Sequence, residues 1–510
     1  MSEFNLGVLA NLGELVEESV EQAGPVGDFI YIDISSIDRV TKKILDPKLL
    51  AQLQAPSRAK QVLQAGDVLV SMTRPNLNAV ALVPDQLEGA IGSTGFYILR
   101  SRWLNPAFLL ALVQTHNFID AMSTVVQGAL YPAVRPRDIA AYAFSFETPA
   151  QQTRIVAKLE ELLSDLDAGV IELKAAQKKL KQYRQSLLKA AVEGALTAEW
   201  RTLNTPLETG AQLLARILIE RRARWQAQQL AKFKEQGKTP PKDWQQKYPE
   251  PIQPDASDLP ALPEGWVWAS GEQLCEFITK GTTPPKSLDS NGEKTIPFLR
   301  VTNLTDRGDL DLADEVFVSA EIHEGFLARS AVYPNDVLMN IVGPPLGQVA
   351  VVPSVFSVWN INQAIAIFRA VDGVSPWFLC RYLLSPLAQQ WLKARSKTTA
   401  GQTNLTLEVC RCLPFPLPPR DEQRALLVNL EMALTSLANQ GQSIDHALKQ
   451  STAQRQNILR AAFAGQLVPQ DPKDEPASVL LARIRAERAA NAKATKPAKL
   501  RKPRTAKDAA

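Results

Sequence analysis

Two long stretches of the chain carry apolar residues at helical spacing. The first runs over 149–196 and the second over 419–467. Each stretch begins on a proline, which is a favoured residue at a helix start. The spacing predicts one continuous helix in each stretch, roughly 70 Å long at 1.5 Å per residue. Since that exceeds the width of a small domain, we expect each helix to bury its apolar row against another long helix.

The apolar rows within these stretches follow a heptad repeat. Leucines recur every seven residues in the first stretch, and a second row that includes Tyr183 lies three or four residues away. The second stretch keeps the repeat less strictly because Ser451 interrupts it. An ordinary scaffold coiled coil fits this pattern as well as a more specific role does. The predicted seam consists of Leu159, Leu166, Leu173, Leu180, Leu187, Leu430, Leu437, Ile444 and Ile458.

The two stretches are also copies of one another. RQSLLKAAVEGAL at 184–196 and RQNILRAAFAGQL at 455–467 share seven identities in thirteen positions. The segments around them repeat as well, since GDVLVSMTRPNLNAVALVP from Gly66 parallels NDVLMNIVGPPLGQVAVVP from Asn335. The identities lie on the helices and on predicted strands, whereas the connections between strands differ. The sequence therefore predicts one scaffold, duplicated, that carries two different surfaces.

Short apolar runs separated by turn residues fill the parts between the long stretches. FIYIDISSI, AGDVLVSM, AVALVP and GFYILR are typical of strands in a compact curved sheet. LNPAFLLALVQ predicts a short helix with Asn105 as its cap. The acidic opening segment, to about Asp28, contains no lysine or arginine, and we expect it to face solvent. A basic helix is expected at about 208–235, and the proline-rich stretch that follows predicts a linker.

Length and composition narrow the function classes. A chain of 510 residues is too long for one hydrophobic core and predicts several domains. No apolar run approaches membrane-spanning length and no basic-then-apolar leader opens the chain, so we expect a cytoplasmic protein without membrane contact. The four cysteines are expected to be reduced thiols. Cys410 and Cys412 would face the same way on a strand, but a lone C-x-C without a nearby histidine is a weak metal signal.

The net charge of +4 is not concentrated in the globular parts. Residues 1–148 carry 11 basic and 15 acidic side chains, and residues 263–418 carry 12 and 15. Because nucleic-acid binders usually show a basic footprint, any binding face must be local. The basic last twenty residues are expected to be disordered, with weak phosphate contact as the alternative. We interpret the arginine-rich segment 216–224 as a solvated face, with a partner or phosphate surface as the alternative.

Motifs for catalysis are missing from the sequence. The chain has no G-x-x-x-x-G-K-[ST], no G-x-G-x-x-G after a strand and no G-x-S-x-G, and its three histidines are widely spaced. NPAF from Asn105 is faintly similar to the N-P-P-Y/F signature of amino-methyltransferases, but its counterpart, SPWF from Ser375, keeps only a helix start. We interpret both as helix caps. The sequence predicts neither a catalytic residue nor a metal or cofactor in this chain.

Six motifs are specific in combination and span nearly the whole chain. They are TAEWR at 197–201, LPEGWVW at 262–268, TKGTTPP at 279–285, IPFLRVTNL at 296–304, PPRDEQRALL at 418–427 and AFAGQLVPQDP at 462–472. Together they resemble the specificity (S) subunits of Type I restriction-modification systems. The first half departs from this pattern because it lacks the LPxGW segment and begins abruptly before YIDISSI.

The resemblance implies an α+β fold: two mainly-β target recognition domains with small helices, alternating with two long helices that pair as an antiparallel coiled coil. Each domain would read one part of a split double-stranded DNA sequence, and the helices would fix the gap between the parts. The implied segments are 1–148 for the first recognition domain, 149–197 for the first long helix, 198–261 for the basic helix and linker, 262–418 for the second recognition domain, 419–468 for the second long helix, and 469–510 for a C-terminal helix and basic tail.

The resemblance also implies partners. Two methyltransferase subunits and two restriction/translocase subunits would carry the adenine methyltransferase and ATP-dependent endonuclease activities. S-adenosylmethionine, ATP and Mg would then be bound by those subunits, and none of them by this chain.

Polar side chains in the connections that differ between the two copies are the candidates for DNA contact, because such groups read base edges and hold phosphates. A solvated turn or a local cap is the alternative for each of them. Arg100 and Arg369 occupy equivalent framework positions, so we interpret them as structural. The candidates are Arg74, Asn76, Asn78, Ser93, Thr94, Tyr131, Arg135, Arg137, Lys280, Thr282, Thr283, Lys286, Arg300, Asn303, Asn360, Asn362, Gln363, Lys397, Thr399, Gln402 and Asn404.

Two hypotheses of other classes remain beside a DNA-reading subunit. One is a coiled-coil scaffold or interaction protein whose β domains bind proteins or peptides. It would be favoured if the candidate connections could be changed to alanine without altering DNA selectivity. The other is an enzyme, which the missing motifs disfavour.

Overall fold

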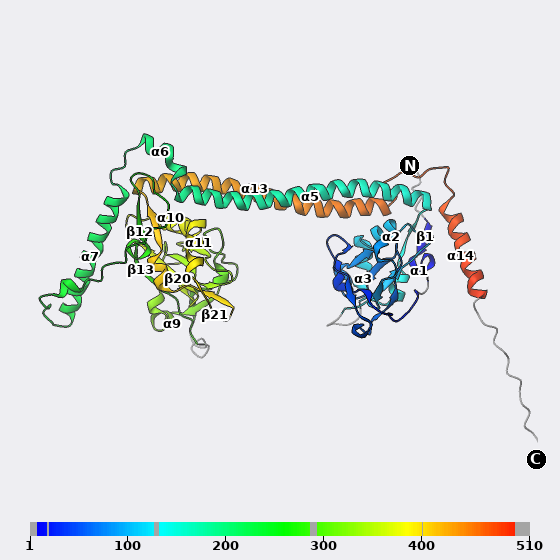
Figure 1. The fold of residues 1–510 in the computed structure, drawn as a ribbon, viewed down its shortest axis with the longest axis horizontal. Helices are drawn as coiled ribbons and strands as arrows, with labels where there is room; N and C mark the ends of the chain where they lie inside the picture. The colour runs from blue at the N-terminus through cyan, green and yellow to red at the C-terminus, as the bar shows by residue number, and fades with distance from the viewer. Residues whose placement is uncertain (1–7, 18–19, 127–131, 286–292, 400, 495–510) are drawn as a thin grey trace, which may run out of the picture. The chain divides into compact units, whose positions relative to one another are not determined.

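Two compact units make up the computed structural model, which describes residues 8–17, 20–126, 132–285, 293–399 and 401–494. The first unit consists of Met1–Ala175 and Ile444–Ala510, and the second of Ala176–Ser443. Each unit combines small sheets with short helices and contains part of two long helices (Figure 1). The predicted mixed α+β class with long helices is confirmed.

The first unit contains eleven strands in its described residues. They are β1 (Val8–Asn11), β2 (Phe29–Ile32), β3 (Ile37–Asp38), β4 (Lys43–Ile44), β5 (Lys48–Leu50), β6 (Ala59–Val62), β7 (Val68–Ser71), β8 (Val80–Leu82), β9 (Ile91–Ser93), β10 (Phe96–Leu99) and β11 (Ala143–Phe146). Its own helices are α1 (Leu12–Leu15), α2 (Pro106–Leu112), α3 (His116–Thr124), α4 (Pro136–Ala140) and α14 (Ala477–Ala494).

Two curved sheets form the body of this unit. One has the order β5-β2-β9-β6, with β2 and β9 parallel, and the other has the order β10-β7-β8. Each predicted strand run contributes one of these strands. The predicted cap is also present, because the Asn105 side chain accepts hydrogen bonds from the amides of Ala107 and Phe108 at the start of α2.

The acidic opening segment does not simply face solvent, as the sequence suggested. β1 pairs antiparallel with β11, and α1 follows directly. Leu12, Leu15 and Val16 are buried in the core of the first unit. The acidic side chains concealed this apolar triplet, whose burial depends on pairing with a strand more than a hundred residues away.

The second unit contains the other strands and helices. The strands are β12 (Val267–Ser270), β13 (Cys275–Lys280), β14 (Lys294–Leu299), β15 (Phe317–Ser319), β16 (Val337–Asn340), β17 (Val342–Gly343), β18 (Val349–Val351), β19 (Asn360–Ile361), β20 (Ile365–Ala370), β21 (Lys397–Thr399), β22 (Gln402–Asn404) and β23 (Pro414–Leu417). The helices are α6 (Ala198–Leu203), α7 (Gly210–Glu235), α8 (Gly271–Leu274), α9 (Ala320–Glu324), α10 (Pro376–Leu383), α11 (Pro386–Arg395) and α12 (Leu407–Cys412).

The sheets of the second unit repeat the pairings of the first. β13-β20-β16-β18 contains the counterpart of β10-β7-β8, and the parallel pair β14–β19 corresponds to β2–β9. β12 pairs with β23 as β1 pairs with β11. The two halves therefore share strand pairing as well as sequence pattern.

The long helices are α5 (Pro149–Val192) and α13 (Arg420–Phe463). Each ends before the repeated segment does, because Gly194 (φ 72°) and Gly465 (φ 71°) adopt the left-handed conformation that stops a helix. All five predicted seam leucines of α5 are buried or half-buried. Tyr183, from the second predicted row, is instead 55% exposed.

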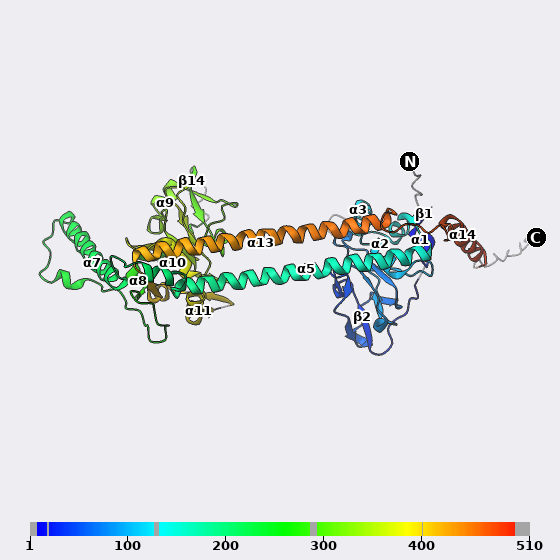
Figure 2. The same cartoon turned by 90° about the horizontal axis from the view of Figure 1, so that it is seen from above.

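Short helices lie between the sheets and the long helices. In the first unit α2 packs against α5 and α13, and in the second unit α10 does so (Figures 1 and 2). Phe108 of α2 shares a buried cluster with Ile155 and Leu459 of the long helices. Phe378 of α10 shares another with Leu188 and Leu426. Each unit is thus built directly onto its own parts of α5 and α13.

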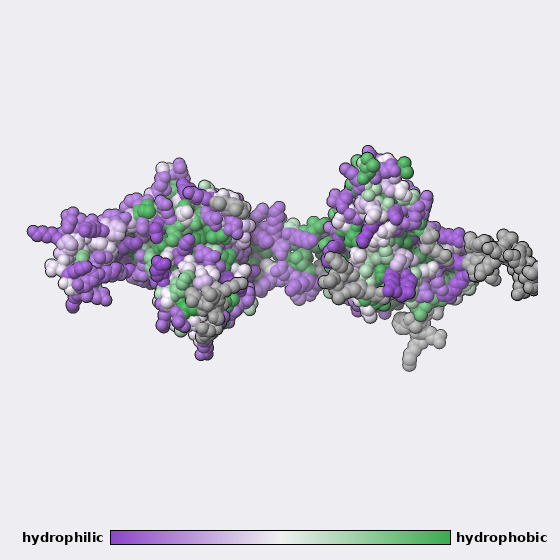
Figure 3. Space-filling view, turned by 90° about the horizontal axis from the view of Figure 1, so that it is seen from below, coloured by the Kyte–Doolittle hydropathy of each residue, from purple (hydrophilic) through white to green (hydrophobic). Residues whose placement is uncertain are grey.

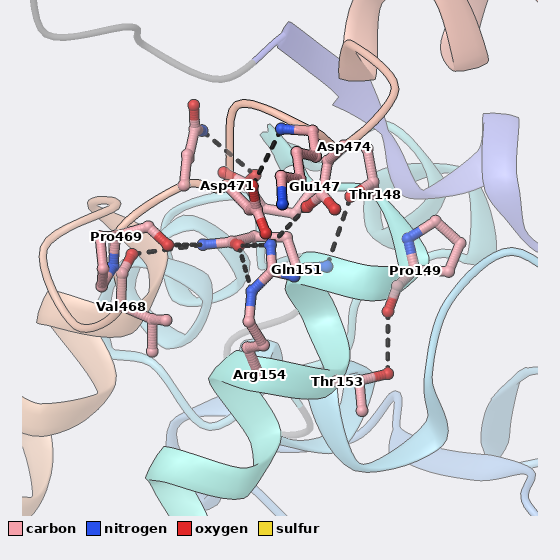
Figure 4. Close-up of polar contacts among 12 residues, drawn as sticks. Glu147, Thr148, Pro149, Gln151, Thr153, Arg154, Val468, Pro469, Asp471 and Asp474 are labelled. Atoms are coloured by element: carbon pink, nitrogen blue, oxygen red, sulfur yellow. Dashed lines mark hydrogen bonds and ion pairs between the residues drawn. The ribbon is translucent and has the colours of Figure 1, made fainter.

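A polar cluster fixes the start of α5 in the first unit (Figure 4). Gln151 donates hydrogen bonds to the carbonyl oxygens of Val468 (3.2 Å) and Pro469 (3.4 Å). Arg154 binds the Gln151 side chain (3.0 Å) and forms an ion pair with Asp474. The first turn of α5 therefore holds the chain that leaves the end of α13.

A buried glutamine in the same turn makes equivalent bonds in both units. Gln152 donates to the carbonyl oxygens of Glu147 (2.7 Å) and Trp103 (3.2 Å) and accepts from the amide of Asn105 (2.7 Å). Gln423 of α13 makes the three matching bonds in the second unit. This side chain ties each long helix to the short helix beneath it.

The segment before the second globular part is packed more closely than a linker would be. Its proline-rich residues contact the second unit, since Ser270 donates to the carbonyl oxygen of Ile252 (2.6 Å) and Trp268 donates to that of Pro260 (3.2 Å). An aromatic cluster joins it to α7, in which Trp225 stacks on Trp244 with ring centroids 5.9 Å apart. The contacting residues are widely spaced in the sequence and follow no periodic pattern, so the sequence did not predict these contacts.

Candidate nucleic-acid interface

An arginine–aspartate pair recurs in the framework of both units. Arg100 donates two 2.8 Å hydrogen bonds to Asp67, and Arg369 donates bonds of 2.7 and 2.6 Å to Asp336. Both aspartate side chains are almost fully buried. The hydrogen bond from Arg100 to Asp67 raises the pKa of the Arg100 guanidinium. These contacts agree with a structural role for the two arginines.

In the first unit, the β7–β8 connection presents two of the candidate residues. Arg74 and Asn76 are exposed on this connection, whose middle forms a short 3-10 helix, Pro75–Leu77. The connection is held to the segment after α3: the Arg74 amide donates to the carbonyl oxygen of Pro132 (2.8 Å), and the Val134 amide donates to that of Met72 (2.8 Å). Arg74 thus combines a fixed backbone with an exposed guanidinium.

Asn78, at the end of the same connection, is buried. Its amide nitrogen donates to the carbonyl oxygen of Val113 (2.8 Å), and its Oδ1 accepts from Lys42 Nζ (2.8 Å). Burial lowers the pKa of Lys42 to about 8. Both donor and acceptor sides of the Asn78 amide are therefore used inside the unit, so we remove Asn78 from the proposed DNA contacts.

The remaining candidates of the first unit differ in accessibility. Ser93 is buried, and its hydroxyl accepts from the Gly95 amide (3.2 Å). Thr94 is half-buried, whereas Arg135 and Arg137 are exposed on and before α4. Tyr131 lies outside the described residues.

In the second unit, a small sheet of order β17-β22-β21 gathers several candidates. Lys397 is paired across the strands with Asn404, and Thr399 with Gln402. Since cross-strand partners lie on the same face of a sheet, these four positions share one face of the ribbon. Lys397 and Gln402 are exposed and Asn404 is half-buried. All four residues are candidates from the sequence, which did not show that they lie together.

A second group lies where β13 ends. Lys280 and Thr283 are exposed, Thr282 is half-buried, and Thr283 donates to the exposed Gln363. Asn362 is half-buried, and its side chain accepts from the Ala364 amide (3.1 Å). Lys286 lies outside the described residues. This group therefore contains both exposed candidates and a local turn contact.

Three candidates in the second unit are fixed by internal contacts. Asn303 is buried, and its side chain bonds to the Asp311 carbonyl oxygen (2.9 Å) and the Arg300 amide (2.8 Å). Asn360 is fully buried and bonds to His323 (2.8 Å). Arg300 pairs with the exposed Asp314 at 2.6 Å. We remove the two asparagines from the proposed contacts, because their polar groups do not reach solvent.

The basic helix α7 does not present a row of uncompensated arginines. Arg216 pairs with Glu208 (3.0 Å) and Glu220 (3.0 Å), and Arg224 pairs with Glu276 (2.7 Å). Arg222 pairs with Glu250, and Arg221 donates to the Cys275 carbonyl oxygen. The hydrophilic surface of this region in Figure 3 is consequently one of mixed charge.

The structure also identifies residues that the sequence reasoning missed. Lys393 and Arg395 are exposed in the last turn of α11, immediately before β21. Arg395 stacks over the Trp391 ring at 4.1 Å. The available signal was charge, because the sequence from 385 to 407 contains no acidic residue. This part of an otherwise acidic globular segment is locally basic.

The described residues lack metal-ligand clusters and membrane-length apolar helices. They contain no group of three or more His, Cys, Asp or Glu side chains that could hold a metal ion. Cys410 and Cys412 lie on α12, a helix, so the strand geometry considered for this pair is wrong. Among the described helices there is also none with the length and apolar character needed to span a membrane.

Comparison with known proteins gives a consistent result. No protein-family profile matches the chain. It is 29% identical over 354 residues to the Type I restriction enzyme EcoBI specificity subunit of Escherichia coli, covering 67% of this chain and 64% of that subunit. It is 23% identical over 411 residues to the EcoDI specificity subunit of Escherichia coli, covering 78% and 79% of the two chains.

A solved structure supports the same fold. It is described as concerning complex assembly and conformational transition of the type I R-M system, and superposes with a TM-score of 0.67 at 24% identity, covering 91% of this chain and 100% of the other. The chain is therefore similar to the specificity subunits of Type I restriction enzymes, which confirms the resemblance that its motifs indicate.

Proposed function

We propose that the chain is a non-catalytic, sequence-specific DNA-binding subunit of a Type I restriction-modification complex. It reads a bipartite, gapped target and directs methyltransferase and restriction subunits to it. The observation that carries this proposal is the recurrence of one framework in two units whose exposed connections differ. A scaffold that binds the same partner twice needs no such difference, whereas two DNA-reading surfaces do.

We infer an internal duplication from matching contacts, besides matching sequence. The Asp67–Arg100 and Asp336–Arg369 pairs occupy corresponding positions, as do the glutamine bonds at the starts of α5 and α13. Gly66 (φ 87°) and Asn335 (φ 72°) place the same left-handed turn before the framework aspartate. Such agreement is expected of two copies of one ancestral half.

We further propose that α5 and α13 pair as an antiparallel coiled coil. In the first unit Ile155, near the start of α5, shares a core with Leu459, near the end of α13. In the second unit Leu188, near the end of α5, shares a core with Leu430, near the start of α13. Both contacts require helices of opposite direction. A stiff pair of this kind would act as the spacer between the two reading units.

The proposed partners are double-stranded DNA, two methyltransferase subunits and two restriction/translocase subunits. Two equivalent units offer two equivalent attachment sites, which supports the number of methyltransferases. In this proposal the complex acts in the cytoplasm, and S-adenosylmethionine, ATP and Mg are bound by the partners. The proposed segments remain 1–148, 149–197, 198–261, 262–418, 419–468 and 469–510.

Methylome sequencing tests the central claim. The chain is expressed with its cognate methyltransferase in a host that lacks its own system. Methylated adenines should appear in one gapped, two-part motif and should disappear when this chain alone is omitted. A soluble complex that methylates no gapped motif would contradict the proposal.

A paired insertion tests the spacer. Seven residues are added to α5 after Ala175 and seven to α13 after Ser443, which preserves the heptad register. The added length is about 10 Å, equivalent to about three base pairs. The gap in the methylated motif should lengthen while both parts stay the same, and an unchanged gap would exclude the spacer role. Alanine substitutions at Lys174 and Lys449, exposed on the same helices, provide the control.

One observation favours the scaffold alternative. The first unit exposes several large aliphatic side chains around β4 and β5, including Leu45 (61%), Leu49 (73%) and Leu53 (101%). Figure 3 shows hydrophobic side chains at the tip of this unit. Exposed apolar groups of this kind often contact other proteins. The scaffold alternative would gain support if the candidate connections of both units could be changed to alanine together without altering DNA selectivity.

A further inference from the structure

Each unit contains a pair of connections that are matched in length. The β7–β8 connection, 72–79, has as many residues as the β16–β18 connection, 341–348. The segment between α3 and α4, 125–135, likewise has as many residues as the segment between α11 and α12, 396–406. Equal length on an equivalent framework lets these segments be compared position by position.

The two members of each pair are bonded to one another in the same way. The Val134 amide donates to the Met72 carbonyl oxygen at 2.8 Å, and the Leu405 amide donates to the Ile341 carbonyl oxygen at 2.9 Å. Thr73 bridges to Ala133 in the first unit. β17 pairs with β22 at the same place in the second unit. Both units therefore build the same two-segment backbone frame.

The polar residues are concentrated on opposite segments of this frame in the two units. In the first unit the β7–β8 connection reads MTRPNLNA, with Arg74 and Asn76 exposed. Its counterpart in the second unit reads IVGPPLGQ and carries no charge. Conversely, the segment at 396–406 reads SKTTAGQTNLT and is mostly polar, whereas that at 125–135 reads VVQGALYPAVR and is mostly apolar, with its one charged residue, Arg135, at its end. A solvated turn has no reason to exchange character in this compensating way.

Arg74 carries a second signal, in its backbone. It adopts the left-handed conformation at φ 47°, which is strained for a residue with a Cβ. The corresponding residue of the second unit, Gly343, does not have a positive φ, so this strained conformation is a feature of the first unit. An arginine therefore stands at a left-handed position that glycine would adopt without strain, with its guanidinium exposed and in no ion pair with another residue that the structure describes. Conformational cost of this kind persists where the side chain itself is needed.

In the second unit, positive charge is concentrated next to the segment 396–406 of the frame. Lys393 and Arg395 in the last turn of α11 lead into Lys397 of β21. On the ribbon, Lys397 and Gln402 are exposed, and the cross-strand pairs to which they belong lie on one face. A two-stranded ribbon fits the major groove of B-DNA, where polar side chains read base edges.

We propose that this two-segment frame is the base-reading element of each unit, with Arg74 and Asn76 reading in the first and Lys397 and Gln402 in the second. The inference rests on the proposed function and deepens it, since it assigns base discrimination to opposite members of an equivalent frame. The ligand is the major-groove edge of a base pair. Arginine and lysine match guanine there, and asparagine and glutamine match adenine.

The test uses the complete methyltransferase complex and two variants of the full chain. Arg74→Gly should relax the first part of the gapped motif and leave the second part intact. The double variant Lys397→Ala/Gln402→Ala should relax the second part only. On duplexes that differ by one base in the affected part, the ratio of methylation rates should fall about tenfold or more, the usual worth of one good base contact. Lys60→Ala and Arg329→Ala, exposed in the same units, are controls that should leave the motif unchanged.

Stability measurements separate reading from folding. Arg74→Gly removes the left-handed cost, so its thermal midpoint should equal or exceed that of the wild type, which a purely structural arginine would not allow. Arg74→Lys, which keeps the charge but loses the planar guanidinium, should relax the same part of the motif. An unchanged motif in these variants would overturn the inference while the proposed function stands. Loss of any gapped motif from the wild-type complex would instead refute the proposed function.

Discussion

Glu422 offers the sharpest test of how the second unit is held to α13. Its side chain is 1% exposed. It accepts hydrogen bonds from the Thr197 hydroxyl (2.6 Å) and the Trp266 indole nitrogen (2.8 Å), and it pairs with Arg201. One carboxylate thus joins the TAEWR and LPEGW motifs to the first turn of the helix.

The expected cost of removing this carboxylate follows from burial. Glu422→Ala removes the carboxylate partner of the Arg201 guanidinium, which is 21% exposed, and the acceptor of the Trp266 indole, while Arg201 keeps its 2.7 Å bond to the Gly194 carbonyl oxygen. Breaking a buried ion pair by removing one partner costs about 3–5 kcal/mol. Glu422→Gln keeps the shape and one acceptor oxygen but sets an amide donor against either Arg201 or the Trp266 indole, both of which are donors. It should cost about 1.5–3 kcal/mol, the worth of one hydrogen bond to a charged group.

Urea unfolding of the full chain measures the free energy of unfolding, and hydrogen exchange of peptides around 194–203 and 420–430 localises the change. The matched control is Asp421→Ala. Asp421 precedes Glu422 on the same turn, but its side chain is 46% exposed and its ion pair with Arg424, at 3.6 Å, lies on the surface. Such a surface pair contributes at most about 1 kcal/mol. A loss in Glu422→Ala no larger than that of the control would refute the reasoning.

Three further predictions concern burial and protonation. Because burial lowers the pKa of Lys42 from 10.5 to about 8, its charged form destabilises the first unit below pH 8, and this cost should disappear between about pH 8 and 10.5. The wild type should therefore gain stability over Lys42→Met across that range in urea unfolding, and a constant difference would contradict this. Burial raises the pKa of the Cys380 and Cys410 thiols to about 12 and raises that of Cys275 as well, whereas only Cys412 is partly exposed. A thiol reagent should modify one cysteine in the folded chain and four in urea, and Cys412→Ser should abolish the native reaction; modification of a second thiol under native conditions would disprove the burial. Leu459 is 1% exposed, so Leu459→Ala should lower the unfolding free energy by about 2–5 kcal/mol, while Lys449→Ala on the same helix should change it by less than about 0.5 kcal/mol. Equal thermal midpoints for these two variants would show that Leu459 is not a core residue.

Local patterns were sufficient for the helices and for several of their ends. The heptad leucines, the Asn105 cap and the strand runs depend on residues close in sequence, and the structure has them where the sequence indicated. The internal repeat was visible too, because identities accumulate on framework positions. The motifs were enough to indicate the family resemblance.

Whether each polar candidate is exposed or buried depends on contacts with residues distant in the sequence. Asn78, Asn303 and Asn360 sit in loops that resemble the other candidates, yet each is buried by segments that the sequence does not place beside it. The apolar residues of α1 were concealed in the same way by acidic neighbours.

The two-segment frame is the clearest case of tertiary determination. Its bridged residues, Thr73 with Ala133 and Val342 with Asn404, are 60 and 62 positions apart, and only the sheet framework brings them together. Sequence alone determined which side chains were available for the proposed DNA contacts, because residue type and local propensity are encoded position by position. Only the tertiary structure decided which of them reach solvent on a common face, because burial and pairing between distant segments are settled by packing of the whole unit.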